Sequence, residues 1–334
     1  MMMAWCFRLA IWSLFIVSSL GLATSHSGNG CTSLNRRKSW YALSKLEQAE
    51  YIRAERCLMK HPPITGSVEG AQNVWDELHR THIFQGNYVH YVGHFLPWHR
   101  YLVRAHELLL QTLCGYTGAQ PYWDELSDYE SGPIHQAAIF DPVFGFGGDG
   151  SGEDGCIQDG PFRDLRLHMT RDTNDANYCL SRSFNQSVFN WASRANIEEC
   201  FVMTDYNDAW QCYNVYPHSA GHAVVGGVMA EPVQSNGDPI FYAHHAYLDR
   251  LWWQWQMADE ANRLTAIGGV NVPPMAILNL VGLQGPSPAL VDYNGDEGNT
   301  TTLRHVLWVH GVIPNATVAD VLDLGGELIC ATYE

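Results

Sequence analysis

The sequence predicts a single, mainly α-helical domain with long irregular loops and few short strands. Segments with one apolar face recur along the chain, and residues that favour helix ends flank them. We find no internal repeat and no linker in the roughly 310 residues that follow the N-terminal leader. The 12 Trp, 16 Tyr and 12 Phe residues can supply a sizeable core for one domain of that length.

Capping residues place the expected helices. Ser44 and Glu47 are spaced for a capping box, and Asp238 followed by Pro239 suits an N-cap and first helical position. Gly115 follows an apolar segment that begins near Pro97 and marks its end. The helices predicted in this way are Ser39–Lys60, Gly70–Phe84, Trp98–Cys114, His218–Met229 and Pro239–Asn262.

Two long stretches show no helical periodicity. Residues 120–179 look irregular, and residues 268–334 mix turns with short extended pieces. The glycine-rich run Phe144–Gly155 is expected to be a surface loop. It lacks the strand-and-helix setting and the lysine of a phosphate-binding loop, so we do not assign it that role.

The N-terminus resembles a secretory signal peptide. Arg8 precedes the almost wholly apolar run Leu9–Leu22, and small residues follow. We predict a signal peptide over residues 1–23, cut after Ala23 or Ser25, and one domain over residues 24–334. A membrane anchor is the alternative, but the run is shorter than the roughly 20 residues that a span needs. The mature protein is therefore expected to be secreted, extracellular and not in a membrane.

The cysteines agree with secretion. Cys6 leaves with the leader, and an even number remains in the mature chain, which indicates disulfide bonds. Eight cysteines allow 105 pairings, and the sequence does not choose among them. Thiolate metal binding is the alternative, but no CxxC pair is present. The eight are Cys31, Cys57, Cys114, Cys156, Cys179, Cys200, Cys212 and Cys330, and possible glycosylation sequons begin at Asn185, Asn299 and Asn315.

The net charge of −16 argues against one class of partner. An acidic chain without a basic run is a poor nucleic-acid binder. We expect small-molecule partners instead.

Histidines gather in two windows. Residues 79–106 hold six and residues 218–245 hold four, so 56 positions carry ten of the 16 histidines. Imidazole is the commonest metal-ligating side chain. Such clustering predicts a metal site built from both windows.

Spacing selects candidate ligands in each window. His218 and His222 lie four residues apart on one helix face, and His245 lies on the next predicted helix. His82, His90 and His99 are spaced by eight and nine residues in the first window. Sites made only of imidazoles suit zinc or copper. A lone zinc site would need one window, whereas two groups of three indicate a pair of ions.

Two motifs resemble the copper-binding motifs of the tyrosinase, catechol oxidase and haemocyanin family. They are HYVGHFLPWHR, which begins at His90, and HSAGH at His218 followed by DPIFYAHHAYLDRLW at Asp238. The resemblance implies a four-helix bundle that holds two copper ions and binds O2. By position it assigns the first copper to His82, His90 and His99, and the second to His218, His222 and His245.

The same resemblance decides between neighbouring histidines. It favours His82 over His79, and His245 over His244, which should pack beside the ligands because it points about 100° away on a helix. His94 is expected to be a hydrogen-bonding neighbour, and His106 a core residue or a neighbour of the ligands. Two acids, Asp238 and Asp249, could orient ligands, although a cap or an ion pair with Arg explains them equally well.

The resemblance implies oxidation of o-diphenols to o-quinones by O2. Family members that also hydroxylate monophenols tend to carry Asn after the first ligand of the second copper, where this chain has Ser219. We therefore expect weak or no monophenol hydroxylation, with Ser219 as a residue that tunes substrate choice. A full tyrosinase and a haemocyanin-like oxygen carrier are the alternatives, and a zinc hydrolase is a third. Tyr88 replaces the Cys that some fungal relatives link to their second ligand, so we expect no thioether.

Overall fold

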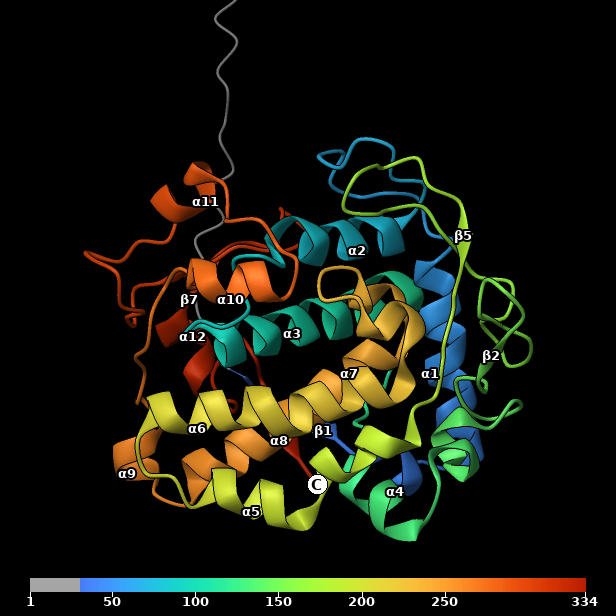
Figure 1. Cartoon of the computed structure of the whole chain (residues 1–334), viewed down its shortest axis with the longest axis horizontal. Coiled ribbons are helices and arrows are strands. Elements are labelled where there is room, and N and C mark those ends of the chain that lie inside the picture. Colours follow the sequence, from blue (N-terminus) through green and yellow to red (C-terminus); the bar gives the residue numbers. More distant parts are fainter. Residues whose placement is uncertain (1–30) are drawn as a thin grey trace, which may run out of the picture. The chain divides into compact units, whose positions relative to one another are not determined.

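Helices dominate the part of the chain that the computed structural model describes, residues 31–334 (Figure 1). The predicted signal peptide lies outside these residues. The α-helices are α1 (Lys45–Leu58), α2 (Val74–Gln85), α3 (Phe95–Cys114), α4 (Glu125–Ser131), α5 (Arg194–Phe201), α6 (Tyr206–Tyr213), α7 (Ser219–Val225), α8 (Ile240–Met257), α9 (Glu260–Arg263), α10 (Met275–Leu280), α11 (Pro288–Asp292) and α12 (Val318–Leu322). The mainly helical prediction is confirmed.

The caps of the first helices follow the sequence closely. Ser44 and Glu47 form the predicted capping box of α1. The second helix begins at Val74, later than expected, because the side chain of Asn73 accepts the backbone N–H of Asp76. Helix α3 ends where predicted, at Gly115, whose φ of 62° is the left-handed conformation that glycine adopts most readily.

The second histidine window has a more complex backbone than one short helix. Helix α6 continues into a π-helical turn, η5 (Asn214–His218), and then into α7. Helix α8 ends at Met257 rather than Asn262, and α9 follows as a separate short helix. Asp238 caps α8 as predicted, because its carboxylate accepts the backbone N–H of Ile240 at 3.1 Å.

Short strands join distant parts of the chain. They are β1 (Asn35–Arg37), β2 (Gly150–Ser151), β3 (Cys156–Ile157), β4 (Arg166–Leu167), β5 (Tyr178–Cys179), β6 (Val306–Leu307), β7 (Ala316–Thr317) and β8 (Ala331–Tyr333). Strand β1 pairs in parallel with β8, and the other strands pair in antiparallel order, β2 with β3, β4 with β5 and β6 with β7. The glycine-rich run is thus a loop apart from β2.

Four disulfides use all eight cysteines that were expected to pair. They are Cys31–Cys330, Cys57–Cys114, Cys156–Cys179 and Cys200–Cys212. The prediction of disulfide bonding is confirmed. The first of them fastens β1 beside β8, and the second joins α1 to the end of α3.

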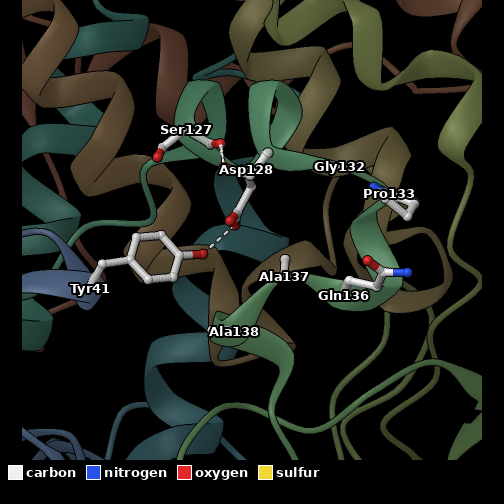
Figure 2. Close-up of a pocket in the computed structure, with 9 residues that line it drawn as sticks. Tyr41, Ser127, Asp128, Gly132, Pro133, Gln136, Ala137 and Ala138 are labelled. Atoms are coloured by element: carbon white, nitrogen blue, oxygen red, sulfur yellow. Dashed lines mark hydrogen bonds between the residues drawn. The ribbon is translucent and has the colours of Figure 1, made fainter.

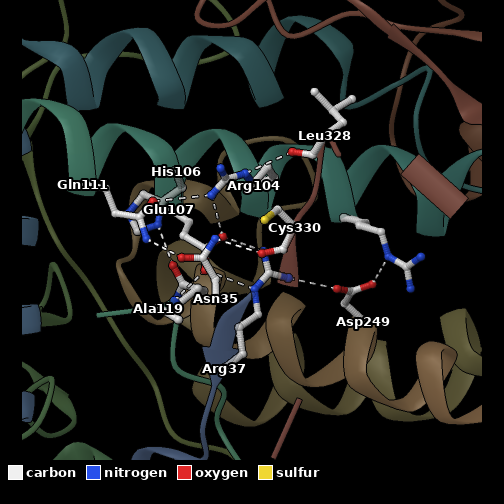
Figure 3. Close-up of polar contacts among 12 residues, drawn as sticks. Asn35, Arg37, Arg104, His106, Glu107, Gln111, Ala119, Asp249, Leu328 and Cys330 are labelled. Atoms are coloured by element: carbon white, nitrogen blue, oxygen red, sulfur yellow. Dashed lines mark hydrogen bonds and ion pairs between the residues drawn. The ribbon is translucent and has the colours of Figure 1, made fainter. Parts of the chain in front are cut away.

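Helices α3 and α8 pack against each other at the centre of the described region (Figure 1). A buried polar network crosses this interface. Arg37 contacts Glu107 of α3 at 3.0 Å and Asp249 of α8 at 3.1 Å (Figure 3). Arg100 of α3 also pairs with Asp249 at 2.5 Å. These contacts hold together the two helices that carry His99 and His245.

No helix within residues 31–334 is both long enough and apolar enough to cross a membrane.

Candidate metal centre

The first histidine group is assembled at the junction of α2 and α3. His82 lies in the last turn of α2, His90 in the connection, and His99 near the start of α3. One ligating atom from each lies within 4.8 Å of the others. The connection turns sharply after His90, since Tyr91 adopts a φ of 59°, which is uncommon for a residue with a side chain. The structure thus brings together the three histidines that spacing selected.

The second group contains one member more than predicted. Ligating atoms of His218, His222, His244 and His245 all lie within 4.8 Å of one another. Two come from the junction of η5 with α7 and two from α8. We expect His244 to pack beside the ligands, and its nearness to the other three is compatible with that, since adjacent residues on a helix point in different directions. Its ring centroid lies 4.8 Å from that of His222.

The two groups adjoin and form one site. The rings of His99 and His245 are stacked, with 4.3 Å between centroids and 10° between planes. His90 and His218 lie 6.1 Å apart between ring centroids. The two windows therefore build a single centre, as the sequence predicted.

Hydrogen bonds orient five of these imidazoles in the same way. In each, Nδ1 faces a backbone carbonyl, which can only accept, so Nδ1 carries the proton and Nε2 keeps its lone pair. The distances range from 2.6 Å for His90 to 3.3 Å for His218. The five carbonyls belong to Val233 for His82, Gly86 for His90, Phe95 for His99, Asn214 for His218 and Met229 for His222.

Several imidazole nitrogens of the two groups have no hydrogen-bond partner, which supports metal binding. The Nε2 atoms of His82, His99 and His218 are buried, and no residue of the described chain hydrogen-bonds to them. Buried polar atoms without partners are rare and need an explanation such as an ion. An all-nitrogen set of neutral donors fits copper. No acidic side chain belongs to either group.

Burial keeps these histidines neutral. Desolvation lowers the pKa of His90 to about 4, and it lowers the pKa of His82 and His99 well below 6.5. The pKa values of His218 and His222 are also lowered, by burial first and by neighbouring imidazoles second. Metal binding requires neutral imidazole, so at pH 7 these side chains do not have to lose a proton first.

An aromatic side chain packs between the two groups. Phe241 is fully buried, and its ring centroid lies 5.1 Å from that of His82 and 4.1 Å from that of His245. It fixes both rings from one side and excludes water from that side of the centre. Nothing in the sequence distinguishes Phe241 from the other aromatic residues of the core.

The two acids proposed as orienting groups do not contact the histidines. Asp249 pairs with Arg37 and Arg100 and accepts from Tyr333 Oη at 2.6 Å. Asp238 caps α8 and pairs with Arg182 at 2.7 Å. Asp238 therefore serves as a helix cap, and both acids form ion pairs with arginine, as the alternative to a ligand-orienting role proposed.

The remaining histidines of the first window lie outside both groups. His79 contacts the Gln234 carbonyl through Nε2 at 3.0 Å, which agrees with the choice of His82. His106 is a core residue that contacts Glu55 at 3.1 Å. The expectation for His94 was wrong in part. It stacks on His305 at 3.8 Å, but neither of its nitrogens has a hydrogen-bond partner among the described residues.

A cavity of about 190 Å³ opens onto the centre. It exposes His90 from the first group and His218 and His222 from the second. Its other lining residues are Tyr91, Trp191, Asn214, Ser219, Ala223, Met229, Ala230 and Pro232. None of the described lining residues carries a carboxylate. Among the lining residues other than histidines, sequence analysis singled out only Ser219. Trp191 was missed because it comes from the distant 3-10 helix η4 (Gln186–Ala192).

Ser219 lines this cavity, but its hydroxyl is engaged. The side chain donates to the backbone carbonyl of Asn214 at 3.0 Å, and the same carbonyl faces His218 Nδ1. The predicted substrate-tuning residue is therefore in place at the cavity wall. Its only hydrogen-bonding group is turned toward the backbone.

A second cavity, of about 260 Å³, lies beside α4 and is lined by no histidine (Figure 2). Tyr41 Oη donates to the carboxylate of Asp128 there, and Trp123 Nε1 donates to it at 2.6 Å. These bonds anchor α4. We assign no ligand to this cavity.

Comparisons with known proteins agree with the histidine geometry. The family model for the common central domain of tyrosinase matches residues 72–258, a range that contains both groups. The tyrosinase-like protein phomQ1 of Diaporthe leptostromiformis is 30% identical over 348 residues, covering 97% of this chain and 84% of the relative. Tyrosinase ustQ of Aspergillus flavus is 30% identical over 328 residues, covering 94% and 83%.

Solved structures share the fold. A mutant polyphenol oxidase from Thermothelomyces thermophila superposes with a TM-score of 0.70 at 24% identity, covering 90% of this chain and 89% of that one. A functional unit of octopus hemocyanin gives a TM-score of 0.54 at 19% identity, covering 90% and 68%. The helical dicopper fold expected from the sequence is confirmed.

Proposed function

The chain belongs to the tyrosinase family, and we propose that it oxidises o-diphenols to o-quinones with O2 while hydroxylating monophenols weakly or not at all. Membership makes it a copper-dependent oxidoreductase with a binuclear copper centre. One observation above all supports the proposal that diphenols, and not monophenols, are the substrates. The cavity over the histidines offers a phenol an apolar, aromatic wall and no carboxylate.

We propose that His82, His90 and His99 hold the first copper, and that His218, His222 and His245 hold the second. When bound, a copper pair would supply the redox chemistry that couples oxidation of the phenol to reduction of O2. The protein keeps the donors neutral by burial and directs Nε2 of five of them through backbone hydrogen bonds. This arrangement needs no side-chain acid to orient those five imidazoles.

The cavity is the proposed site for the phenol ring. Trp191 and Tyr91 supply aromatic faces, and Met229 supplies a flexible apolar contact. A ring held there has its hydroxyl groups directed toward His90, His218 and His222, since these are the histidines that the cavity exposes.

Weak monophenol hydroxylation follows from the lack of a proton acceptor. A monophenol has to lose its proton as it reacts, and a positioned base contributes typically 10²–10⁴-fold to such a step. Ser219 is a poor base and already donates to a backbone carbonyl. A catechol is a better substrate here because its ring already carries both hydroxyl groups, so that it has to lose electrons and protons but no oxygen atom has to be inserted.

The disulfide-rich fold is consistent with the proposed secretion. All eight cysteines of residues 31–334 are paired, and disulfides persist in oxidising compartments. The three candidate glycosylation residues, Asn185, Asn299 and Asn315, are exposed. We retain secretion and glycosylation as proposals.

Oxygen consumption by copper-loaded protein tests the activity. With 4-methylcatechol and with tyrosine supplied separately, we expect rapid uptake with the catechol and at least tenfold slower uptake with tyrosine. Comparable rates would make the protein a full tyrosinase. Reversible O2 binding without turnover of either compound would make it an oxygen carrier.

A further inference from the structure

A strained turn carries Tyr91 to the wall of the cavity. Tyr91 follows His90 directly and adopts a φ of 59°, which lies in the left-handed region. Glycine and asparagine adopt this conformation readily, whereas a bulky side chain makes it unfavourable. Backbone strain of this kind gathers at binding sites, so the outlier raises the question of what the tyrosine side chain does there.

The surrounding chain holds this turn from both sides. Before it, His90 Nδ1 donates to the backbone carbonyl of Gly86 at 2.6 Å. After it, Gly93 donates its backbone N–H to the carbonyl of Val270 at 2.8 Å. Tyr206 Oη also donates to the carbonyl of Gly93, at 2.7 Å. These contacts would hold the same turn with glycine in the strained position, so the backbone alone does not explain a tyrosine there.

The hydroxyl of Tyr91 has no partner among residues 31–334. Burial alone raises its pKa, with no contribution from a charged or hydrogen-bonding neighbour. The strained Cys330 differs in this respect, because a disulfide to Cys31 holds its side chain. Contacts within the described chain therefore give the Tyr91 hydroxyl no structural role.

The histidines lie deeper in the cavity than Tyr91. His90 and His218 are 5% and 8% exposed, whereas Tyr91 is only half-buried. A catechol whose hydroxyl groups face the histidines turns the opposite end of its ring toward the less buried part of the wall. Tyr91 belongs to that part, so its hydroxyl is placed to meet a ring substituent and not the reacting hydroxyl groups.

The wall of the cavity is uncharged. None of its described lining residues is Asp, Glu, Lys or Arg. Glu231 is next to two lining residues in the chain, but its carboxylate pairs with Arg171 at 2.6 Å and accepts the backbone N–H of Gln234 at 2.6 Å. A charged substituent would lose water here without gaining a partner, which is unfavourable, so the wall favours a neutral one.

Tyr91 supplies the one hydroxyl of the described wall that is available to a ligand. The hydroxyl of Ser219 already donates to a backbone carbonyl, and the amide of Asn214 lies deeper, at 6% exposure. A tyrosine hydroxyl is protonated at neutral pH and can donate a hydrogen bond. A carbonyl oxygen on the substrate is a suitable acceptor.

We propose that Tyr91 is a specificity-determining residue whose hydroxyl donates a hydrogen bond to an uncharged polar substituent of the substrate. The preferred class is then a catechol that carries a neutral acceptor, such as an ester carbonyl, on the side of the ring opposite its hydroxyl groups. This inference rests on the proposed oxidation of o-diphenols. The bond selects the substrate and takes no part in electron transfer, so it acts on KM and not on kcat.

The alternative is that Tyr91 supplies only an aromatic face. Tyr91→Phe separates the two roles, because it keeps the ring and removes the hydroxyl. If the face alone matters, phenylalanine serves every substrate equally well. If the hydroxyl matters, the loss is confined to substrates that carry an acceptor.

KM values for two catechols of similar length test the proposal. Methyl 3,4-dihydroxyphenylacetate carries an ester that a methylene separates from the ring, and 4-propylcatechol carries no acceptor. Tyr91→Phe should raise KM for the ester by about 3- to 10-fold, the range expected for one hydrogen bond, and leave KM for 4-propylcatechol unchanged. Equal changes for both compounds, or a change in kcat alone, would overturn the proposal.

A third catechol tests the uncharged substrate class. The free acid, 3,4-dihydroxyphenylacetate, differs from the methyl ester in its charge. In the parent protein its KM should be higher than that of the ester by about 10-fold or more. Equal KM values for the acid and the ester would overturn the preference for a neutral substituent.

A matched control uses another half-buried tyrosine. Tyr129 of α4 does not line the cavity, and Tyr129→Phe removes the same group. We expect this variant to keep the KM values of the parent. A rise equal to that of Tyr91→Phe would show a general effect and overturn the assignment. The melting temperature of Tyr91→Phe should equal that of the parent, and a fall would show that the hydroxyl is structural and likewise overturn it.

Binding without turnover separates this inference from the proposed function. Calorimetry in the absence of O2 on the copper-loaded protein would use the single phenols methyl 4-hydroxyphenylacetate and 4-propylphenol. Tyr91→Phe should weaken binding of the ester alone, by about 3- to 10-fold. That result supports the recognition role even if the parent oxidises neither catechol, which would show that the proposed function is wrong. Equal ester affinity in parent and variant would overturn the role of Tyr91, even in a protein that oxidises both catechols.

Discussion

The imidazoles of His99 and His245 are stacked almost in parallel, with 4.3 Å between their centroids. One belongs to the first histidine group and the other to the second. Helices α3 and α8 carry them, and the buried Arg37–Asp249 contact ties the strand before α1 to α8 in the same region. The relative placement of the two proposed coppers therefore depends on the packing of these two helices.

Removing His245 tests the ligand assignment. The His245→Gln variant loses a donor and the stacking partner of His99, so copper content should fall from two ions to one. Oxidase activity should fall by at least about 100-fold, beyond the 10- to 100-fold that partners of ligands typically contribute. Metal analysis and oxygen uptake measure both. The exposed His135 gives the control, since His135→Gln should keep both ions and full activity.

Ser219 is expected to control the balance between monophenols and diphenols. An Asn side chain at this position can extend into the cavity and offer its carbonyl to the phenol proton. Ser219→Asn should raise the ratio of tyrosine hydroxylation to catechol oxidation by about 10-fold, below the full 10²–10⁴-fold of a well-placed base.

The control for this change is Ser219→Ala. The hydroxyl donates only to the Asn214 backbone, so its loss should leave the ratio unchanged. If alanine raised the ratio as much as asparagine, the effect would come from space in the cavity and not from a proton acceptor.

Trp191 is expected to bind the substrate ring without taking part in the chemistry. Trp191→Ala should raise KM for catechols by about 3- to 10-fold, the equivalent of the 0.5–1.5 kcal/mol of an aromatic pair. The value of kcat should stay the same. Phe201 is equally exposed, at 38%, and does not line the cavity, so Phe201→Ala should leave KM unchanged. A drop in kcat alone would contradict this role.

The buried Glu107 should make stability depend on pH. Burial is the largest single influence and would raise the pKa of Glu107, but Arg37, Arg104 and the backbone N–H of Gln120 together outweigh it and bring the pKa below the ordinary 4.5. A lowered carboxyl pKa means that the stabilisation is complete above about pH 4.5 and is lost as the pH falls through the folded-state pKa. Glu107→Gln should therefore destabilise the protein at pH 7 by about 3 kcal/mol, because it leaves Arg37 with one fewer anion (Figure 3).

Chemical denaturation at several pH values checks this prediction. The gap between parent and variant should shrink below pH 4.5. A gap that is constant down to pH 3 would contradict it. Glu297 pairs with Arg304 at the surface, and Glu297→Gln should have no measurable effect at any pH.

Spacing and capping signals predicted much of this structure. The end of α3, the capping box of α1 and the cap of α8 depend on local contacts, so the sequence alone locates them, whereas α3 begins three residues before the predicted Trp98. The selection of His82, His90 and His99 as one cluster succeeded for a related reason. All three lie within 18 residues on two helices and the connection that joins them.

Features that depend on distant contacts were not predictable. Helices α4, α5 and α6 are short, and their helical character comes from packing and caps such as Asp205. The contact between His244 and Glu125 joins residues that lie 119 positions apart in the chain, so no local pattern of the sequence reveals it. The parallel pairing of β1 with β8 likewise joins the two ends of the described region.

The most direct test of the dicopper account is metal analysis of purified protein combined with an optical spectrum after hydrogen peroxide is added. The account predicts two copper ions per chain and a new, intense near-ultraviolet absorption band. Zinc in place of copper, or a single metal ion per chain without that band, would contradict it.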